Sequence, residues 1–165
     1  MNNLRLMYTD TDSFVYHVKT DDLYHDMHID KHLYDLTAVK IDEYRNAEND
    51  KKLGKMKDET HMVPIKEFLA CGPKSYSFVL DTDKEKRVCK GVQKSVLEKD
   101  ITHDDYKNVI STNKNIVKKQ TTLRSLNHQV YTMQYDKICL SAFDDKVFRI
   151  SANEGYPYGY NPAKK

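Results

Sequence analysis

Hydrophobic and polar positions alternate in two short runs near the beginning of the chain. Apolar side chains recur at every second position across residues 4–8, and again at Phe14, Tyr16 and Val18. A period of two is typical of a half-buried β-strand. The polar residues between the runs, rich in Asp and Thr, have the chemistry of a hairpin loop. The pattern therefore predicts a β-hairpin with acidic residues at its turn.

Asp10 and Asp12 are the two carboxylates of this turn. In extended backbone, residues two apart leave the same face, with Cα atoms roughly 6.6 Å apart. Such carboxylates repel one another unless they are solvated or hold a cation. Oxygen ligands without a nearby His or Cys favour Mg²⁺ or Mn²⁺ over zinc. An ordinary exposed acidic turn remains an alternative. An EF-hand calcium loop is excluded, because Phe14 stands where a third ligand is needed and no Gly follows it.

The rest of the pattern predicts an α+β fold. A helix is expected over Asp21–Leu36 with Thr20 as its N-cap, and a loop over Val39–Lys52. Four strands forming an antiparallel meander are expected over residues 54–59, 63–70, 74–80 and 85–90. Two short helices follow at 92–99 and 102–111, then a strand-like tail from Ile116. The C-terminal end is expected to be loose, at Gly155, Pro157, Gly159 and Pro162.

Two local signals refine these elements. Lys74 is in phase with Tyr76 on one face of its expected strand, so its amine could reach past a buried stripe. Thr102 and Asp105 approximate a helix capping box, with Asp in place of the preferred Glu.

Composition and cysteine usage narrow the class of protein. The chain has 165 residues, 32% charged and 39% hydrophobic, which suits one polar globular core with a small appendage. We expect no signal peptide and no membrane span. Cys71, Cys89 and Cys139 form no C-x-x-C pair and predict reduced thiols in a nuclear or cytoplasmic protein. Three histidines on the first helix are interpreted as a polar surface stripe rather than a zinc site: His25, His28 and His32.

Charge is distributed unevenly along the chain. Residues 1–50 carry five basic and eleven acidic side chains, whereas the remaining residues carry 22 and 14. The stretch from Tyr106 to Tyr135 contains no acid. An acidic head that could gather metal and a basic body that could follow phosphates suit a nucleic-acid enzyme. An ordinary solvated surface would explain the charges equally well.

Several motifs, taken in order, resemble those of a known enzyme family. The run from Tyr8 to Ser13, Tyr-Thr-Asp-Thr-Asp-Ser, resembles motif C of family-B DNA polymerases, in the protein-primed branch carried by Polinton (Maverick) transposons and related viruses. Residues 53–59 are similar to the palm segment that follows motif C, and residues 74–76 to the Lys-x-Tyr motif. Residues 90–92 are similar to the Lys-Gly-Val that leads into the thumb, and residues 127–132 and 141–146 to two segments of the family's tail.

The resemblance implies a fold, a chemistry and a set of site residues. Residues 1–90 would form part of a palm with an antiparallel sheet, and residues 91–165 a thumb-like segment and tail. Asp12 would bridge two Mg²⁺ or Mn²⁺ ions, with Asp10 supporting it and Thr11 and Ser13 orienting the carboxylates. Primer-template DNA, deoxynucleotides and a terminal priming protein would be its partners. The implied DNA contacts are Lys74, Tyr76, Lys90 and Arg124.

The resemblance departs from the family upstream of the hairpin. Motif A, which supplies the other bridging Asp, and motif B, which meets the nucleotide, precede motif C in the family, but only seven residues precede Tyr8 here. We therefore expect a C-terminal polymerase segment that is inactive alone. The alternative is a non-catalytic DNA-binding or interaction remnant of a transposon polymerase.

Overall fold

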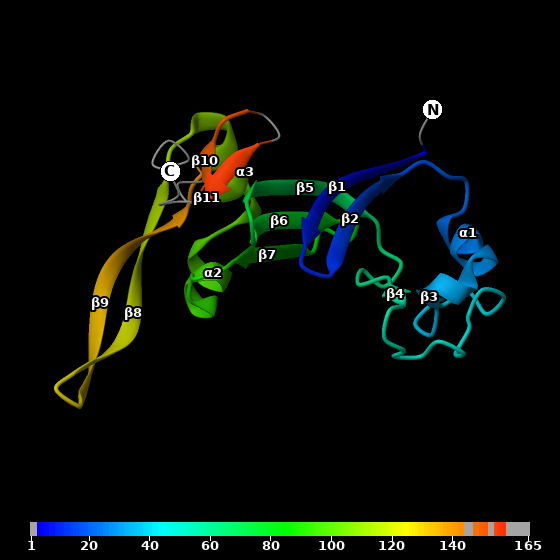
Figure 1. Cartoon of the computed structure of the whole chain (residues 1–165), viewed down its shortest axis with the longest axis horizontal. Coiled ribbons are helices and arrows are strands. Elements are labelled where there is room, and N and C mark those ends of the chain that lie inside the picture. The colour runs from blue at the N-terminus through cyan, green and yellow to red at the C-terminus, as the bar shows by residue number, and fades with distance from the viewer. Residues whose placement is uncertain (1–2, 144–146, 152–153, 158–165) are drawn as a thin grey trace, which may run out of the picture. The chain divides into compact units, whose positions relative to one another are not determined.

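The computed structural model describes residues 3–143, 147–151 and 154–157, and the fold is α+β with antiparallel hairpins, as predicted. Figure 1 labels the helices and strands along the chain. The chain divides into two compact units: the first comprises Met1–Glu67 with Val79–Glu85, and the second Phe68–Phe78 with Lys86–Lys165. The expected division into a palm part at residues 1–90 and a thumb-like part at residues 91–165 stays a prediction.

The first unit begins with the predicted hairpin. Strand β1, Leu4–Asp10, pairs antiparallel with β2, Ser13–Val18. The register shifts between Leu6 and Tyr8, so Met7 forms a β-bulge. Contrary to the half-buried expectation, the apolar side chains at Leu4, Leu6, Met7, Phe14 and Tyr16 are exposed.

The helix expected over Asp21–Leu36 is shorter than predicted. Helix α1 spans Leu23–Ile29, and the separate 3₁₀-helix η1 spans Lys31–Leu33. Asp22, not Thr20, is the N-cap, because its carboxylate accepts hydrogen bonds from the Tyr24 and His25 amides.

A small hydrophobic core of the first unit includes Met27 of α1. Strand β3, Tyr34–Asp35, pairs in parallel with β4, Met56–Lys57, which is all that forms of the strand expected over 54–59. Between them runs the predicted polar loop, with one bridge from Leu36 to Asn46. The buried members of this core are Met27, Leu36 and Val39, packed against Tyr24, Tyr34, Tyr44 and Met62.

Three of the four strands expected in the meander form one sheet, whereas β4 pairs with β3 instead. The strands of this sheet, β5, Ile65–Gly72, β6, Ser75–Leu80, and β7, Glu85–Cys89, are ordered β5-β6-β7. The alternation predicted Lys74 to be the first residue of β6, and that is wrong. Lys74 lies in the β5–β6 turn with φ 56°. Strand β5 ends at Gly72, two residues later than expected, just before Pro73, which has no amide hydrogen to donate to a ladder.

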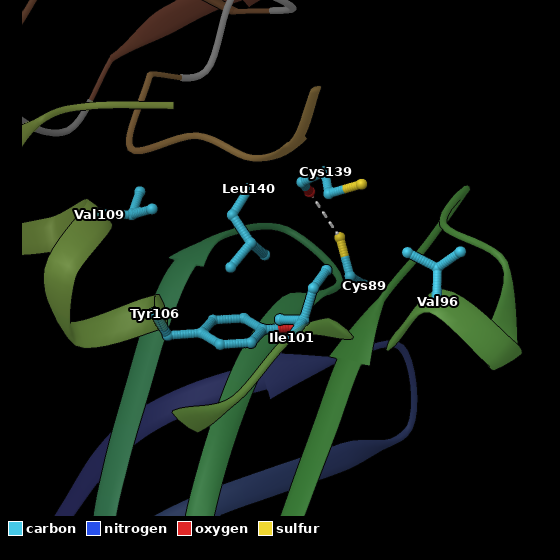
Figure 2. Close-up of a cluster of buried hydrophobic side chains, with 7 residues drawn as sticks. All are labelled: Cys89, Val96, Ile101, Tyr106, Val109, Cys139 and Leu140. Atoms are coloured by element: carbon cyan, nitrogen blue, oxygen red, sulfur yellow. Dashed lines mark hydrogen bonds between the residues drawn. The ribbon is translucent and has the colours of Figure 1, made fainter. Parts of the chain in front are cut away.

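Two helices and the following strands bury the largest core. Helix α2 spans Lys94–Asp100 and α3 spans His103–Thr112, each shifted by one or two residues from its expected range. The capping box at Thr102 and Asp105 is confirmed, with both reciprocal bonds present. In the core (Figure 2) the Cys89 thiol donates to the Cys139 carbonyl at 2.9 Å; its buried residues are Cys89, Val96, Ile101, Tyr106, Val109, Cys139 and Leu140.

The strand-like tail is a long two-stranded ribbon. Strand β8, Ile116–Leu126, pairs antiparallel with β9, Gln129–Leu140. Asn127 and His128 form the two-residue turn with φ 49° and 64°, as a hairpin of primed type requires.

Two short strands form within residues 147–157, where the sequence predicted part of a loose end. Strand β10, Val147–Arg149, pairs with β11, Gly155–Pro157. The expected loose end is therefore wrong at Gly155 and Pro157, whereas Gly159 and Pro162 lie outside the described residues. Among the described helices, none has the length and apolar character needed to cross a membrane.

Candidate metal-binding hairpin and nucleic-acid contacts

The acidic residues of the hairpin occupy different structural positions. Asp10 is the last residue of β1 and pairs with Ser13, the first residue of β2, so Thr11 and Asp12 alone form the loop. The premise that both carboxylates follow extended backbone is therefore wrong, because Asp12 belongs to the turn. Asp10 is half-buried and Asp12 is exposed.

Thr11 adopts a backbone conformation that is rare for its residue type. Its φ is 59°, in the left-handed region that β-branched residues seldom enter. Two-residue hairpin loops need a positive φ at this first loop position, so the turn geometry imposes the conformation. Strain of this kind persists where the surrounding structure or a function requires it.

The hydroxyls beside Asp10 act on different atoms. The Thr11 hydroxyl donates to the Asp10 carboxylate at 3.3 Å, whereas the Ser13 hydroxyl donates to the Asp10 backbone carbonyl at 3.0 Å. Thr11 is thus placed to orient the carboxylate, and Ser13 closes the turn.

The donor set fits only part of a divalent-metal site. Carboxylate oxygens are the ligands that Mg²⁺ and Mn²⁺ prefer. Across the part of the chain that the structure describes, no group of three or more His, Cys, Asp or Glu residues is arranged to hold a metal ion. Asp10 and Asp12 therefore supply two hard donors, and the remaining ligands of a two-metal centre would have to come from elsewhere.

The three histidines of the predicted surface stripe do not share one helix. His25 and His28 lie on α1, but His32 lies in η1, because α1 ends at Ile29. The His25 and His28 rings both contact the Tyr44 ring, at centroid distances of 5.8 and 5.7 Å. The His28 Nδ1 atom also lies 3.3 Å from the Tyr44 carbonyl oxygen.

Asp58 lies within the segment that resembles the palm after motif C, and its carboxylate accepts four hydrogen bonds. The donors are the Thr60 amide and hydroxyl, the Met62 amide and the Tyr24 hydroxyl, at 2.6–2.8 Å. Burial opposes ionisation, but these bonds outweigh it and lower the pKa of Asp58. Burial, together with the Asp58 charge, raises the pKa of Tyr24.

Asp35 repeats the same arrangement on β3. It is buried and accepts bonds from the Thr37 amide and hydroxyl and from the Lys51 amide. Burial again opposes ionisation, and these bonds lower the pKa of Asp35. Asp35 and Asp58 both line a hollow of about 10 Å³, which has room for about one water molecule and not for a nucleotide.

The roles of Asp35 and Asp58 were missed from the sequence. Both occur as Asp-x-Thr, at residues 35–37 and 58–60. In this spacing the carboxylate can accept from the amide and hydroxyl two residues later. The repeated spacing was the available signal for two loop-anchoring acids.

The expected DNA contacts around the sheet gather at one of its ends. The Lys90 amide donates to the Lys74 carbonyl at 2.9 Å, so the β5–β6 turn and the residue after β7 are adjacent. Gly91 follows with φ 88°, and its carbonyl accepts a hydrogen bond from the Lys137 amine of β9. The structure therefore brings Lys74 and Lys90 together.

Tyr76 and Arg124 lie in different settings. The half-buried Tyr76 stacks on Phe68 of β5, with centroids 5.8 Å apart and an interplanar angle of 29°. Arg124 is exposed on β8, directly opposite Tyr131 of β9. The hairpin residues 10–13 belong to the first unit, and Lys74, Tyr76, Lys90 and Arg124 belong to the second.

The three cysteines are free thiols of the largest core, with Cys89 and Cys139 buried in it and Cys71 packed against it. Burial raises the pKa of Cys71 to about 11 and also raises that of Cys89. A raised pKa suppresses the thiolate, so neither is suited to nucleophilic chemistry at neutral pH.

Comparison with known proteins found no match to a protein-family model, a curated protein or a solved structure.

Proposed function

We propose that this chain is a palm-and-thumb segment of a DNA-directed DNA polymerase of family B, in the protein-primed branch. The observation that carries the proposal is the hairpin of β1 and β2, whose Asp-Thr-Asp tip lies between two short strands with Thr11 at φ 59°. The Lys-x-Tyr and Lys-Gly-Val segments follow in the family's order.

The chemistry would be transfer of a nucleotide to a primer 3′-hydroxyl, with release of pyrophosphate. When bound, two Mg²⁺ or Mn²⁺ ions would activate the attacking oxygen and stabilise the leaving one. Asp12 is exposed at the tip, where a ligand is accessible, and is the candidate bridging carboxylate. Asp10 would support it, held by the Thr11 hydroxyl.

Other residues would hold the nucleic acid. Lys74 and Lys90, joined through their backbones, would offer two amines to the primer strand. The Tyr76 ring would act from the sheet and Arg124 from the ribbon. Deoxynucleotides and a terminal priming protein complete the proposed partners, and the free thiols suit a reducing nuclear or cytoplasmic compartment.

The exposed hairpin supports the idea that further polypeptide completes the site. Leu6, Phe14 and Tyr16 are each more than two-fifths exposed, and the Phe14 and Tyr16 rings stack 5.8 Å apart. A two-stranded hairpin is marginal alone, and apolar side chains of this kind suit contact with another strand or protein. A strand carrying the second bridging carboxylate would meet both needs.

A non-catalytic DNA-binding role is the second candidate. It is favoured by the lack of a third metal-ligating side chain among the described residues and by the basic character of the ribbon. This role requires DNA binding without any metal-dependent chemistry.

Primer extension distinguishes the two roles. The 165-residue chain alone should not extend a primer with Mg²⁺ or Mn²⁺. Fused behind the upstream palm and fingers of a related polymerase, it should restore extension. A fusion that folds and binds primer-template but never extends it would refute the polymerase assignment and favour the second role.

A further inference from the structure

The β8–β9 ribbon extends from the largest core as a two-stranded sheet with two different faces (Figure 1). Successive side chains of a strand point to opposite sides, so every second residue belongs to the same face. The inner face turns toward the core, because the buried Gln120 amide donates to the buried Cys139 sulfur at 3.2 Å. The outer face consists of the alternate residues from 117 to 125 on β8 and from 130 to 138 on β9.

The outer face is exposed and carries apolar side chains along its length. Every residue of this face except Thr121 is exposed. Near the base, Val117 lies opposite Ile138, and they are 52% and 54% exposed. Toward the tip, Leu123 and Val130 are 72% and 70% exposed. Exposed apolar side chains that share one sheet face are typical of an interaction surface.

The outer face carries one charge of each sign. Lys119 and Asp136 lie directly opposite one another in the register, and both are exposed. Among the residues that the structure describes, no ion pair engages either side chain. The other residues of the face are uncharged, so the face as a whole is neutral. A neutral face does not select a polyanion or a polycation, but it complements itself.

A second copy of the chain fits this face when the two-fold axis of the dimer runs parallel to the strands. Strand β8 of each copy then lies over β9 of the other. Lys119 faces the partner's Asp136 at two symmetric places, and Val117 faces the partner's Ile138. An axis running across the strands would instead place the two copies of Lys119 over one another, which like charges disfavour. Sheets pack face to face about 10 Å apart, with their side chains interdigitated.

The edge of β8 is less available than the face. Gln93 accepts a hydrogen bond from the Thr121 amide at 3.1 Å and donates one to the Thr121 carbonyl. These are the backbone groups that an added strand would need at this point of the edge. The arrangement therefore favours packing of a second copy on the outer face over extension of the sheet through β8.

We propose that two copies of this chain form a dimer through the outer faces of their β8–β9 ribbons. The face is about 27 Å long from Val117 to Ser125 and two strands, or about 10 Å, wide. This is smaller than a standard interface of about 800 Å² per partner, so we expect a weak dimer with a dissociation constant of about 10–100 µM. The inference goes beyond the proposed function and does not depend on it, because Arg124 lies on the face opposite the interface.

The test is sedimentation equilibrium of the whole chain in a reducing buffer, which prevents disulfide-linked dimers. Chain concentrations from about 5 to 500 µM bracket the expected dissociation constant. We expect a monomer–dimer equilibrium in this range. Far-ultraviolet circular dichroism checks that each variant described below is folded.

Two charge-reversed variants test the facing of Lys119 and Asp136. Lys119→Glu alone and Asp136→Lys alone should each weaken self-association about tenfold, because both symmetric pairs change from attractive to repulsive. An equimolar mixture of the two variants should associate within about threefold of the wild-type strength, since each introduced charge then meets an opposite one. A merely structural effect of either substitution would not be repaired by mixing.

Apolar substitutions test the rest of the face. Leu123→Ser/Val130→Ser should weaken association about tenfold, because apolar area is no longer removed from water. Leu126→Ser is the matched control, since Leu126 is 65% exposed near the same tip but belongs to the opposite face. This control should leave the dissociation constant within about twofold of the wild-type value.

Three results would overturn the proposed dimer. The first is a wild-type chain that remains monomeric at the highest concentration, which would leave the face to a different protein. The second is a mixture of the charge-reversed variants that associates no more strongly than either variant alone. The third is a dimer that Leu126→Ser weakens as much as Leu123→Ser/Val130→Ser, or that none of these variants weakens.

Discussion

The Ser77 hydroxyl on β6 lies 2.9 Å from Nδ1 of His103, and both side chains are buried. The same hydroxyl lies 3.2 Å from the Lys86 carbonyl, to which it can donate. A hydroxyl carries one proton, so when it donates to Lys86, Nδ1 of His103 carries the proton and donates to Ser77. This pair joins the sheet to the first residue of α3.

Removal of this hydroxyl should destabilise the second unit. Ser77→Ala deprives the buried His103 ring and the Lys86 carbonyl of a hydrogen-bond partner, which costs about 1–3 kcal/mol of unfolding free energy. Ser75→Ala is the matched control on the same strand, since its half-buried hydroxyl makes only a 3.8 Å contact with the Cys89 sulfur. Urea denaturation measures both variants. An equal loss in Ser75→Ala would contradict a specific role for the Ser77–His103 pair.

The capping box of α3 gives a second stability prediction. Thr102→Ala removes the acceptor of the Asp105 amide and should lower the unfolding free energy by about 1 kcal/mol. For a chain of this size that corresponds to a fall in Tm of about 2–4 °C. Ser111→Ala, near the other end of the helix, loses a 3.1 Å bond to the Asn108 carbonyl and should change Tm less. Thermal unfolding followed by circular dichroism compares the two.

The capping box, three strands of the meander and both short helices were predictable from the sequence because their signals are local: a cap, a turn or a run of alternating residues. The length of α1 was not, because Asp22 competed with Thr20 as the cap and Asp30 ended the helix early. Lys74 was misplaced because alternation alone cannot locate where a turn begins.

The candidate site was predictable only in part. The hairpin and its acidic tip followed from alternation, yet a two-residue loop moved Asp12 out of the strand and removed the assumed geometry. The bond from the Tyr24 hydroxyl to Asp58 was missed because the two residues are 34 positions apart in the sequence. Long-range hydrogen bonds of this kind have no periodic signature.

Asp58 should make stability depend on acid pH. Its folded-state pKa lies below the ordinary value of 3.8, so its contribution is fully present above that value and is lost as the pH falls through the folded-state pKa. Asp58→Asn should lower the unfolding free energy by about 2 kcal/mol at neutral pH, because bonds to a charged acceptor are lost.

The difference between Asp58→Asn and the native chain should therefore shrink below pH 4. Urea denaturation at pH 7, 4 and 2.5 measures it. Glu59→Gln, at the adjacent exposed position, should show no such convergence. A constant difference at all three pH values would show that the Asp58 charge does not contribute.

Gly91 and Gly72 should respond differently to the same substitution. Gly91 has φ 88°, and a Cβ there would lie 3.2 Å from the Lys137 amine, so Gly91→Ala should cost about 1–2 kcal/mol. A Cβ added at Gly72 would point into open space, and the φ of Gly72 lies outside the left-handed region. Gly72→Ala should be nearly neutral by urea denaturation. A larger loss of unfolding free energy in Gly72→Ala than in Gly91→Ala would show that the Lys90–Gly91 turn does not have the described conformation.

The sharpest test of the proposed chemistry is the contrast between Asp12 and Asp10 in the fusion with an upstream palm. Asp12→Asn should lower the extension rate by about 10³-fold or more, since loss of one ligand charge at a two-metal centre removes several kcal/mol of transition-state stabilisation. Asp10→Asn should cost less, because that carboxylate is half-buried and held by Thr11 rather than exposed at the tip.

Asp21→Asn, an exposed acid of the same unit outside the hairpin, is the matched control and should extend at the wild-type rate. Single-turnover primer extension at saturating DNA measures the three variants, with anisotropy confirming that each still binds primer-template. If Asp12→Asn extended within threefold of wild type, or if Asp21→Asn were equally impaired, Asp12 would have no metal-bridging role. The hairpin would then be an acidic turn with no part in the chemistry.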